Sequence, residues 1–475
     1  MNSGGGKSRK AERSVELREQ SVPPPTLRSY LFLFLWCAAV TILLHCPMLF
    51  KPHSEGDELA YFVLSQRMGW DLSNYTTKDD PRINKFPYTI YRNPVFHHPP
   101  LLPLVLRAGA HFTANPLLQF TRTVPPRSRS GDSADYVTPA PVAAVFLFNV
   151  FVSVAALWYV CRLLVLCEIK PQYGAAALVG ITLCPLVLFS TVRIHHDGLA
   201  GLLLLCGFIA FAESLERRAI IPALEAACWL VAAMNVRFNA IAALPPLLFM
   251  PLYASTRPRS PAPKGDSENR VGPVESAPSR PGWVAPAIVL GAVFTLGMQH
   301  YYRLIVTYGT LWPGAFVQPI GDVAKFSSFL AIVERMTRSW VCWELAAMFP
   351  LAVLFVAPWT VRRYWGDWQA RKWPVWFVFI FAFLFVTQLA FAYKQVRYFA
   401  AVTPFMHVCW PYLLRLSPLR EWIKWSIWGL GGVTLLLMVT TGFLNASLHD
   451  PDQTLILPSI TIYWPTLLDA YRPPR

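Results

Sequence analysis

The segment of residues 29–50 constrains this chain more than any other, because it contains no Asp, Glu, Lys or Arg. A helix rises about 1.5 Å per residue, so a segment of this length crosses a hydrocarbon core of ~30 Å. It is too long for a signal-peptide core and lacks a small-residue cleavage site, so we interpret it as a retained anchor. Further apolar segments follow at residues 140–161, 171–192, 198–212, 220–236, 238–256, 281–302, 345–361, 373–393, 398–414 and 425–448. The sequence therefore predicts an all-α polytopic membrane protein with about eleven transmembrane helices.

The composition of the 475-residue chain agrees with this class. Hydrophobic residues make up 54% of the chain and charged residues only 15%, whereas about 25% of residues are charged in an ordinary soluble domain. The formal net charge is +15, which membrane topology and an anionic substrate explain. The chain contains no nucleotide-binding glycine loop and no nucleic-acid-binding module, so we do not expect a nucleic acid as a partner.

Lys and Arg predict the orientation of the spans. Residues 1–28 are polar and basic and are expected to form a disordered cytoplasmic tail. With this tail inside, counting the spans places the other basic clusters in the cytoplasm, as the positive-inside rule requires. These clusters lie at residues 217–218, 257–280, 362–372 and 415–424.

The same count divides the chain into two membrane modules. Residues 29–254 form the N-terminal module, whose first outer loop is residues 51–139. Residues 255–282 are rich in Pro, Ser and Arg and are predicted to be a flexible cytoplasmic linker. Residues 283–448 form the C-terminal module, and residues 449–475 form an extracytoplasmic tail.

The first outer loop contains a short acidic helix. Ser54 is placed to cap this helix, and Gly69 offers a left-handed stop at its end. Asp57 and Glu58 then lie in the first turn, where unpaired backbone N–H groups and the helix dipole favour an ionised carboxylate, while each acid disfavours ionisation of the other. Adjacent acids at a membrane surface are a candidate site. The alternative is that they only cap a surface helix.

Short motifs follow the first span in a fixed order: Gly56-Asp57-Glu58-Leu59-Ala60-Tyr61, Met68-Gly69-Trp70-Asp71 and His98-Pro99-Pro100-Leu101. In this order the motifs resemble the GT-C glycosyltransferases, in particular the dolichyl-phosphate-mannose-protein mannosyltransferase and aminoarabinose transferase-like families. The resemblance implies a GT-C-type bundle with short surface helices in the first outer loop. It also implies inverting transfer of a hexosyl or pentosyl group from a polyprenyl-phosphate donor to the hydroxyl of a lipid, glycan or protein acceptor. The chain departs from these families at residues 121–139, a polar insert before the second span.

The expected chemistry assigns roles to the acidic pair. An alcohol that attacks an anomeric carbon must lose its proton, so a carboxylate is needed as general base or as the acceptor that orients the nucleophile. Asp57 matches the first acid of the family motif, which carries catalysis in the resembled families. Glu58 is expected either to tune Asp57 or to bind the acceptor.

The leaving phosphate gains negative charge and requires cations. Arg397 is the first candidate, because Arg397-Tyr398 before Pro404 resembles a stretch that recurs in these transferases. Lys394 lies at i−3 on the same helical face. Lys85 and His98 are further candidates for the phosphate. The alternative is that these cations only extend to the membrane interface beside an aromatic belt.

Asp197 opens the fourth span and follows His195 and His196. The resemblance places such an acid near the donor, and the predicted topology puts it on the same membrane face as Asp57, Arg237 and Arg397. Candidate substrate-binding residues are therefore Asp197, His196, Tyr61, Tyr398 and Arg237. The alternative is that Asp197 is only an N-cap.

Some alternatives remain open in the sequence. The pairs His97/His98 and His195/His196 could hold a divalent metal together with Asp57, but no ligand spacing supports one, so no cofactor is assigned. A transporter or flippase of a lipid-linked anion is the alternative function, although such proteins tend to place charges and broken helices at mid-bilayer. We expect membrane lipids as surroundings and a bacterial plasma membrane as location, with the endoplasmic reticulum membrane as the alternative.

Overall fold

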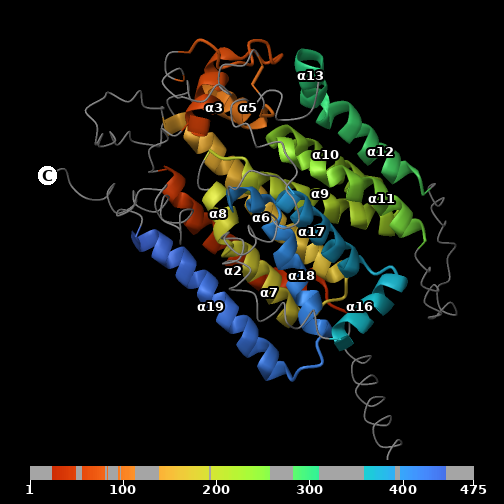
Figure 1. Cartoon of the computed structure of the whole chain (residues 1–475). Helices are drawn as coiled ribbons and strands as arrows, with labels where there is room; N and C mark the ends of the chain where they lie inside the picture. The colour runs from red at the N-terminus through yellow and green to blue at the C-terminus, as the bar shows by residue number, and fades with distance from the viewer. Residues whose placement is uncertain are drawn as a thin grey trace, which may run out of the picture.

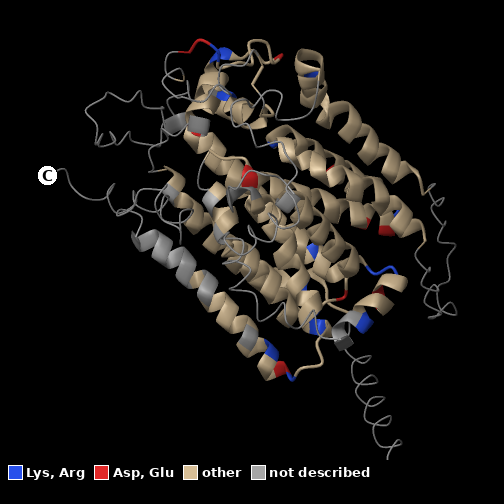
Figure 2. Cartoon of the chain, in the orientation of Figure 1, with Lys and Arg blue, Asp and Glu red and all other residues tan. Residues whose placement is uncertain are grey.

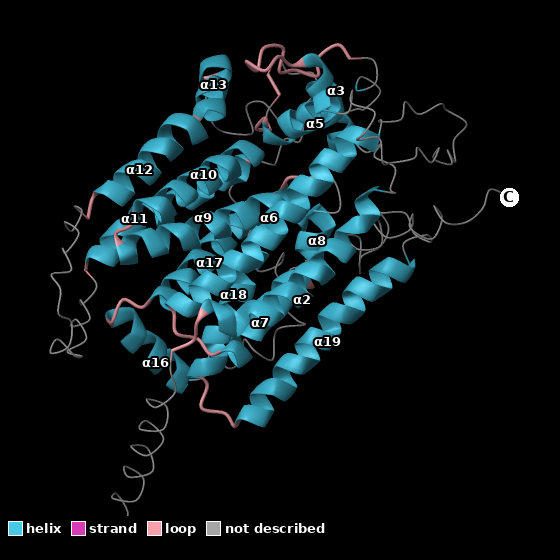
Figure 3. Cartoon of the chain, turned by 180° about the vertical axis from the view of Figure 1, so that it is seen from behind, coloured by secondary structure: helices cyan, strands magenta, loops and turns pink. Residues whose placement is uncertain are grey.

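The structure is a computed structural model that describes residues 24–49, 56–80, 83, 95–96, 98–112, 139–191, 194–256, 282–309, 358–390 and 396–445. Most of the predicted N-terminal tail, most of the linker and the C-terminal tail lie outside these ranges, and the last two residues of the predicted tail, Leu27 and Arg28, already belong to the first described helix. Regular secondary structure within them is helical throughout, without a strand (Figure 3). The all-α prediction is therefore confirmed for the described residues.

The first half of the chain supplies the helices around the candidate site. In chain order these are α2 (Leu27–His45), η1 (Cys46–Leu49), α3 (Gly56–Arg67), α5 (Leu101–Phe112), α6 (Pro139–Leu166), α7 (Pro171–Thr182), α8 (Pro185–Thr191), α9 (Asp197–Arg217), α10 (Ile220–Val236), η4 (Phe238–Ala243) and α11 (Leu244–Ser255). The second half contributes α12 (Val284–Ala292), η5 (Val293–Gly297), α13 (Gln299–Tyr308), α16 (Pro358–Gln369), α17 (Trp373–Ala390), η7 (Val396–Ala401), α18 (Thr403–Leu416) and α19 (Glu421–Asn445).

The described part contains 5 helices that are long and apolar enough to cross a membrane, or up to 7 if each bent pair counts as one span. The straight ones are Leu27–His45, Val142–Leu166, Pro171–Leu188, Asp197–Arg217 and Phe238–Ser255. The bent pairs correspond to the predicted spans 281–302 and 373–393, and the predicted span 345–361 lies largely outside the described residues. The chain is thus a multi-pass membrane protein.

Charged residues are unevenly distributed along the bundle. Lys, Arg, Asp and Glu gather toward the ends of the helices, while the ribbon between the ends is mostly uncharged (Figure 2). Helices α3, α5 and α13 lie together at one end, and α16 lies at the opposite end, as two views show (Figures 1 and 3). We name these the α3 end and the α16 end. A helical bundle with charges at its ends matches a bilayer, because an unpaired charge in hydrocarbon is costly.

Helix α9 is the central helix. Of the residues in its most apolar stretch, 94% are buried inside the protein, whereas only 22% of those in the apolar stretch of α2 are buried. Close packing is possible because Gly201 lies against the backbone of Ala400 and Ala401 in η7, where a Cβ would clash with the Ala401 carbonyl oxygen. A larger residue at position 201 would push η7 away from α9.

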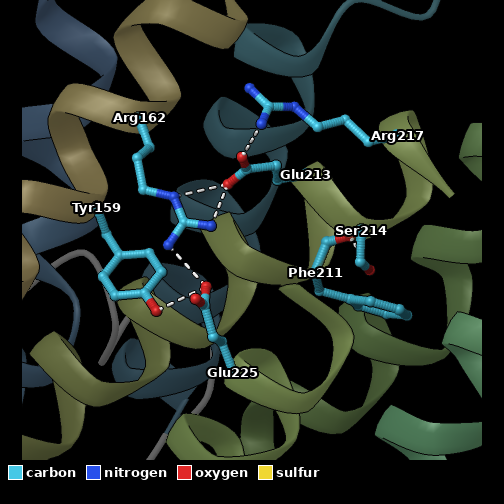
Figure 4. A network of polar contacts seen from close by, with 7 residues as sticks. All are labelled: Tyr159, Arg162, Phe211, Glu213, Ser214, Arg217 and Glu225. Atoms are coloured by element: carbon cyan, nitrogen blue, oxygen red, sulfur yellow. Dashed lines mark hydrogen bonds and ion pairs between the residues drawn. The ribbon is translucent and has the colours of Figure 1, made fainter. Parts of the chain in front are cut away.

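An ion-pair network fastens the C-terminal end of α9 (Figure 4). Arg162 of α6 donates from Nε to Glu213 of α9 at 2.7 Å and from Nη1 to Glu225 of α10 at 2.6 Å. The Tyr159 hydroxyl also donates to Glu225 at 3.0 Å, and Arg217 lies 2.8 Å from Glu213. These contacts join three helices through paired charges, which is how a buried charge becomes tolerable.

The end of the acidic helix differs from the prediction. Helix α3 ends at Arg67, and Gly69 is not among the residues with positive φ, so it is not a left-handed stop. A Cβ on Gly69 would meet the Asp71 carboxylate and the Ser73 hydroxyl, which are the ends of exposed side chains and can move aside. The predicted cap Ser54 lies outside the described residues.

Candidate functional site

Helix α3 forms one wall of a buried polar site. Glu58 and Tyr61 are at i and i+3, so they share a helical face, and each is only 1% exposed. The Ile194 N–H donates to Glu58 Oε1 at 3.4 Å, and the Tyr61 hydroxyl is hydrogen-bonded to His196 Nδ1. Both contacts reach the segment just before α9. The acidic motif of the first outer loop therefore packs against the start of the fourth predicted span.

The segment before α9 forms the second wall. His195 Nδ1 lies 3.0 Å from Asp197 Oδ2, and the His195 and His196 rings stack with centroids 4.5 Å apart. Asp197 is fully buried, in the first turn of α9. The N-cap position is His196, which makes no side-chain cap hydrogen bond. Capping therefore does not account for the Asp197 carboxylate.

Arg237 neutralises that carboxylate. Its Nη1 pairs with Asp197 Oδ1, and its side chain is only 4% exposed. Helix α10 ends at Val236, where the backbone of Arg237 turns extended, with φ −143 and ψ 137. The Tyr301 hydroxyl donates to the Arg237 carbonyl at 3.0 Å and holds this turn in place. The residue that follows α10 thus places its guanidinium beside the first turn of α9.

The His-Pro-Pro-Leu motif completes the site. The His98 ring centroid lies 4.3 Å from that of His196 and 6.1 Å from that of Tyr61. The Tyr75 hydroxyl donates to the His98 carbonyl at 2.8 Å. Burial raises the pKa of Tyr75 well above its ordinary value, so this hydroxyl keeps its proton. The loop is thereby held over His196.

We call this group the buried cluster. It consists of the buried residues Glu58, Tyr61, His195, His196, Asp197 and Arg237, together with the partly buried His98. Most of the candidate residues whose side chains are described meet here, although they come from separate parts of the sequence. The cluster combines carboxylates with one guanidinium and several imidazoles, so it offers proton acceptors, hydrogen-bond donors and positive charge within a dehydrated space.

The remaining candidates are placed only in part. Asp57 lies in α3, and Arg397 and Tyr398 lie in η7, but their side chains are outside the described part of the chain. The close approach of Ala401 to Gly201 brings η7 against α9. Gly201 lies one turn beyond Asp197, on the same face of that helix. Lys85 and Lys394 are outside the described residues.

A metal competes poorly for the donors in the buried cluster. His195, His196 and Asp197 offer ligand atoms that all lie within 4.8 Å of one another. However, Arg237 already pairs with the Asp197 carboxylate, and the Tyr61 hydroxyl engages His196 Nδ1. A divalent cation beside the guanidinium would meet a like charge, so these residues do not fit a metal in this arrangement.

Sequence reasoning missed other polar residues near the α3 end. The motifs assign His195 no role beyond its position next to Asp197, yet its ring contacts the Asp197 carboxylate directly. A cavity of about 350 Å³ is lined by Asp71, Leu72, Ser73, Asn235, Gln299, His300 and Arg303. Asp71 belongs to a recognised motif, but no spacing in the sequence connects it with residues more than a hundred positions away.

The chain has a structural likeness to a solved protein. No protein-family model and no curated protein matches the sequence. The crystal structure of ArnT from Cupriavidus metallidurans bound to undecaprenyl phosphate matches 93% of this chain and 75% of that chain, with a TM-score of 0.46 and 15% identity. At this identity and TM-score the match does not assign an activity to the chain.

Proposed function

We propose that this chain is a membrane glycosyltransferase that moves a sugar from a polyprenyl-phosphate donor to an acceptor hydroxyl, with inversion. One observation carries the proposal. Tyr61 of the acidic motif and His98 of the His-Pro-Pro-Leu motif both contact His196, beside the buried pair of Asp197 and Arg237. Motif residues that have no local structural reason to meet therefore form one polar site within an apolar bundle.

The reaction needs a single displacement. The acceptor oxygen bonds to the anomeric carbon while the bond from that carbon to the phosphate oxygen breaks. The hydroxyl proton passes to a carboxylate, and the electron pair of the broken bond leaves with the polyprenyl phosphate. Asp57 is the proposed base, with Glu58 as its partner, because Asp57 occupies the first acidic position of the motif. A positioned general base contributes about 10²–10⁴-fold to such a step.

Positive charge must stabilise the departing phosphate. Arg397 is the proposed main contact, supported by the packing of η7 against α9 one turn from Asp197. Lys394, Lys85 and His98 are proposed to add to it. Arg237 is a different case, because its pairing with Asp197 means that it orients the cluster rather than meeting the phosphate directly. Tyr398, His196 and Tyr61 are proposed to line the sugar.

The alternative is a transporter or flippase of a lipid-linked anion. Such a protein must expose its substrate site alternately to each membrane face, usually through broken helices near mid-bilayer. Here α3 packs against the cluster at the α3 end, while the charged residues of Figure 4 pair with one another at the C-terminal end of α9. This arrangement favours chemistry at one membrane face.

The sugar, the acceptor and the membrane belong to the proposal as well. A mannosyl-type or aminoarabinosyl-type donor follows from the motif resemblance, and a bacterial plasma membrane is proposed over the endoplasmic reticulum.

The test uses the purified full chain in nanodiscs. Radiolabelled mannosyl, glucosyl and aminoarabinosyl polyprenyl phosphates are supplied with a membrane glycolipid extract, and release of polyprenyl phosphate is measured. Release that depends on the extract supports the proposal. Movement of intact donor across proteoliposomes without any release would establish the flippase instead.

A further inference from the structure

The cavity at the α3 end is separate from the buried cluster. Its walls come from the loop after α3, from the last turn of α10 and from the first turns of α13. Its volume of about 350 Å³ lies at the lower end of the ~300–1,000 Å³ of small-molecule sites. A ligand the size of one sugar residue therefore suits it better than a lipid tail.

The cavity has a fixed wall on each side. Arg303 Nη1 donates to the Leu72 carbonyl at 2.8 Å, which ties α13 to the loop. The Tyr308 hydroxyl donates to the Val95 carbonyl at 2.8 Å and fastens the same helix one turn further on. Asn235 Nδ2 donates to the Leu296 carbonyl at 3.3 Å, so α10 is held as well. These bonds preform the cavity and reduce the ordering needed on binding.

The lining chemistry suits a neutral ligand with many hydroxyls. Each sugar hydroxyl both donates and accepts, and the cavity offers the Asp71 carboxylate as acceptor and the Arg303 guanidinium as donor. The side chains of Ser73, Asn235 and Gln299 add groups of mixed character. The charges of Asp71 and Arg303 cancel, which disfavours a strongly anionic ligand.

Asp71 is held ready as an acceptor. The Ser73 hydroxyl and the Ser73 N–H donate to its Oδ1 at 2.6 and 3.0 Å. The hydroxyl bond is the main reason that the pKa of Asp71 lies below its ordinary value, so the carboxylate is ionised at neutral pH. Both bonds go to Oδ1, so neither of them occupies the other carboxylate oxygen.

Aromatic contacts connect this cavity with the buried cluster. His300 of the cavity wall packs edge-on against Tyr75 with ring centroids 5.8 Å apart. Tyr75 packs against Phe96 at 6.2 Å, and Phe96 packs against Tyr61 at 6.2 Å. Asn235 also lies only two positions before Arg237 in the sequence. A continuous run of ring contacts therefore links the cavity to the cluster.

We propose that this cavity binds a neutral sugar residue of the acceptor, so that the acceptor is a glycan or glycolipid rather than a protein side chain. The inference rests on the proposed function, since it names the acceptor class of the same enzyme. A carboxylate and amides converging beside the buried cluster would hold the acceptor sugar while one of its hydroxyls extends toward the reacting carbon. The cavity then decides which acceptor is used.

The test measures sugar binding and sugar transfer separately on the full chain in nanodiscs. Saturation-transfer NMR follows the methyl glycosides of glucose, galactose, mannose and N-acetylglucosamine, with glucose 6-phosphate and a serine-rich peptide as comparisons. Gln299→Trp fills the cavity from an exposed position, and Val306→Trp places the same side chain on the same helix outside the cavity lining. Asp71→Asn removes the charged acceptor with little change of shape.

We expect at least one neutral glycoside to bind wild type and Val306→Trp equally, and Gln299→Trp and Asp71→Asn to weaken binding at least tenfold. Equal glycoside binding by Gln299→Trp and wild type would overturn the inference, as would preference for the phosphate or the peptide. Wild type that transfers sugar to the peptide but binds no glycoside retains the proposed function and loses the inference. Wild type that binds glycosides in the cavity but transfers no sugar retains the cavity as a sugar site and loses the proposed function.

Discussion

The Asp197 carboxylate pairs with the Arg237 guanidinium in the interior of the bundle, joining the first turn of α9 to the residue that ends α10. Neither side chain is more than 4% exposed. A buried charge without its partner is strongly unfavourable, whereas a pair replaced on both sides by uncharged groups can be close to neutral.

We therefore expect Arg237→Met to destabilise the protein by about 3–5 kcal/mol, because Asp197 then stays buried without its counter-charge. The double variant Asp197→Asn with Arg237→Met should recover much of this loss. Thermal unfolding in detergent, followed by tryptophan fluorescence, measures the difference. Equal stability of the single variant and wild type would show that the carboxylate finds another partner.

The catalytic assignment predicts a different result for the acidic pair. Asp57→Asn should lower sugar transfer by roughly 10²–10⁴-fold while leaving unfolding and donor binding unchanged, because Asn cannot accept the hydroxyl proton. Glu58→Gln is the matched control. Its side chain is buried and accepts a hydrogen bond from the Ile194 N–H, which a Gln carbonyl also accepts. Transfer at the wild-type rate by Asp57→Asn would place the base elsewhere, and a larger loss in Glu58→Gln would assign the role to Glu58.

Arg397 should show the behaviour of a phosphate ligand. Arg397→Ala removes a charge-assisted contact to the departing phosphate and should raise the barrier by about 2–4 kcal/mol. Arg397→Lys should raise the barrier less, because lysine keeps the positive charge and lacks only the planar guanidinium that can form two parallel hydrogen bonds. Donor binding and single-turnover rates, measured in nanodiscs, show how much each variant loses. Unchanged kinetics in a folded Arg397→Ala protein would leave an interfacial anchor as its role.

Cysteine labelling tests the orientation of the chain in the membrane. Lys78 lies in the exposed loop after α3 and Arg362 lies in exposed α16, near opposite ends of the molecule. Lys78→Cys in a background without reactive native cysteines should react with an impermeant maleimide in intact cells. Arg362→Cys should react only after permeabilisation. Labelling of Arg362→Cys in intact cells would reverse the predicted topology.

The network of Figure 4 should be structural and not catalytic. Arg162→Met removes the cation that pairs with Glu225 and leaves Glu213 with Arg217 alone, so we expect a loss of about 1–3 kcal/mol in unfolding free energy. At temperatures where the variant is folded, the Michaelis constant for donor should equal that of wild type. A changed constant with normal stability would connect this network to the site.

Periodicity and apolar length determined the fold class from the sequence alone. Helix α10 has the bounds that its apolar segment predicts, Ile220–Val236, and α9 extends its predicted span only at the ends. Such agreement arises because backbone hydrogen bonds within a bilayer must be satisfied inside each segment, so the local sequence specifies the helix. Motif order likewise makes Tyr61 and His98 candidates, and its place at the start of the fourth span makes Asp197 one.

Tertiary structure alone decided which candidates meet. Tyr61 reaches His196 across 135 residues of sequence, and no local pattern encodes that distance. Gly69 shows the same limit on a smaller scale, since the sequence predicts a left-handed stop there and the structure shows no positive φ angle at that position. A sequence determines which segments become helices because that choice is local. Which side chains face one another is decided by how helices pack, and a small residue such as Gly201 sets that packing only once its neighbour is present.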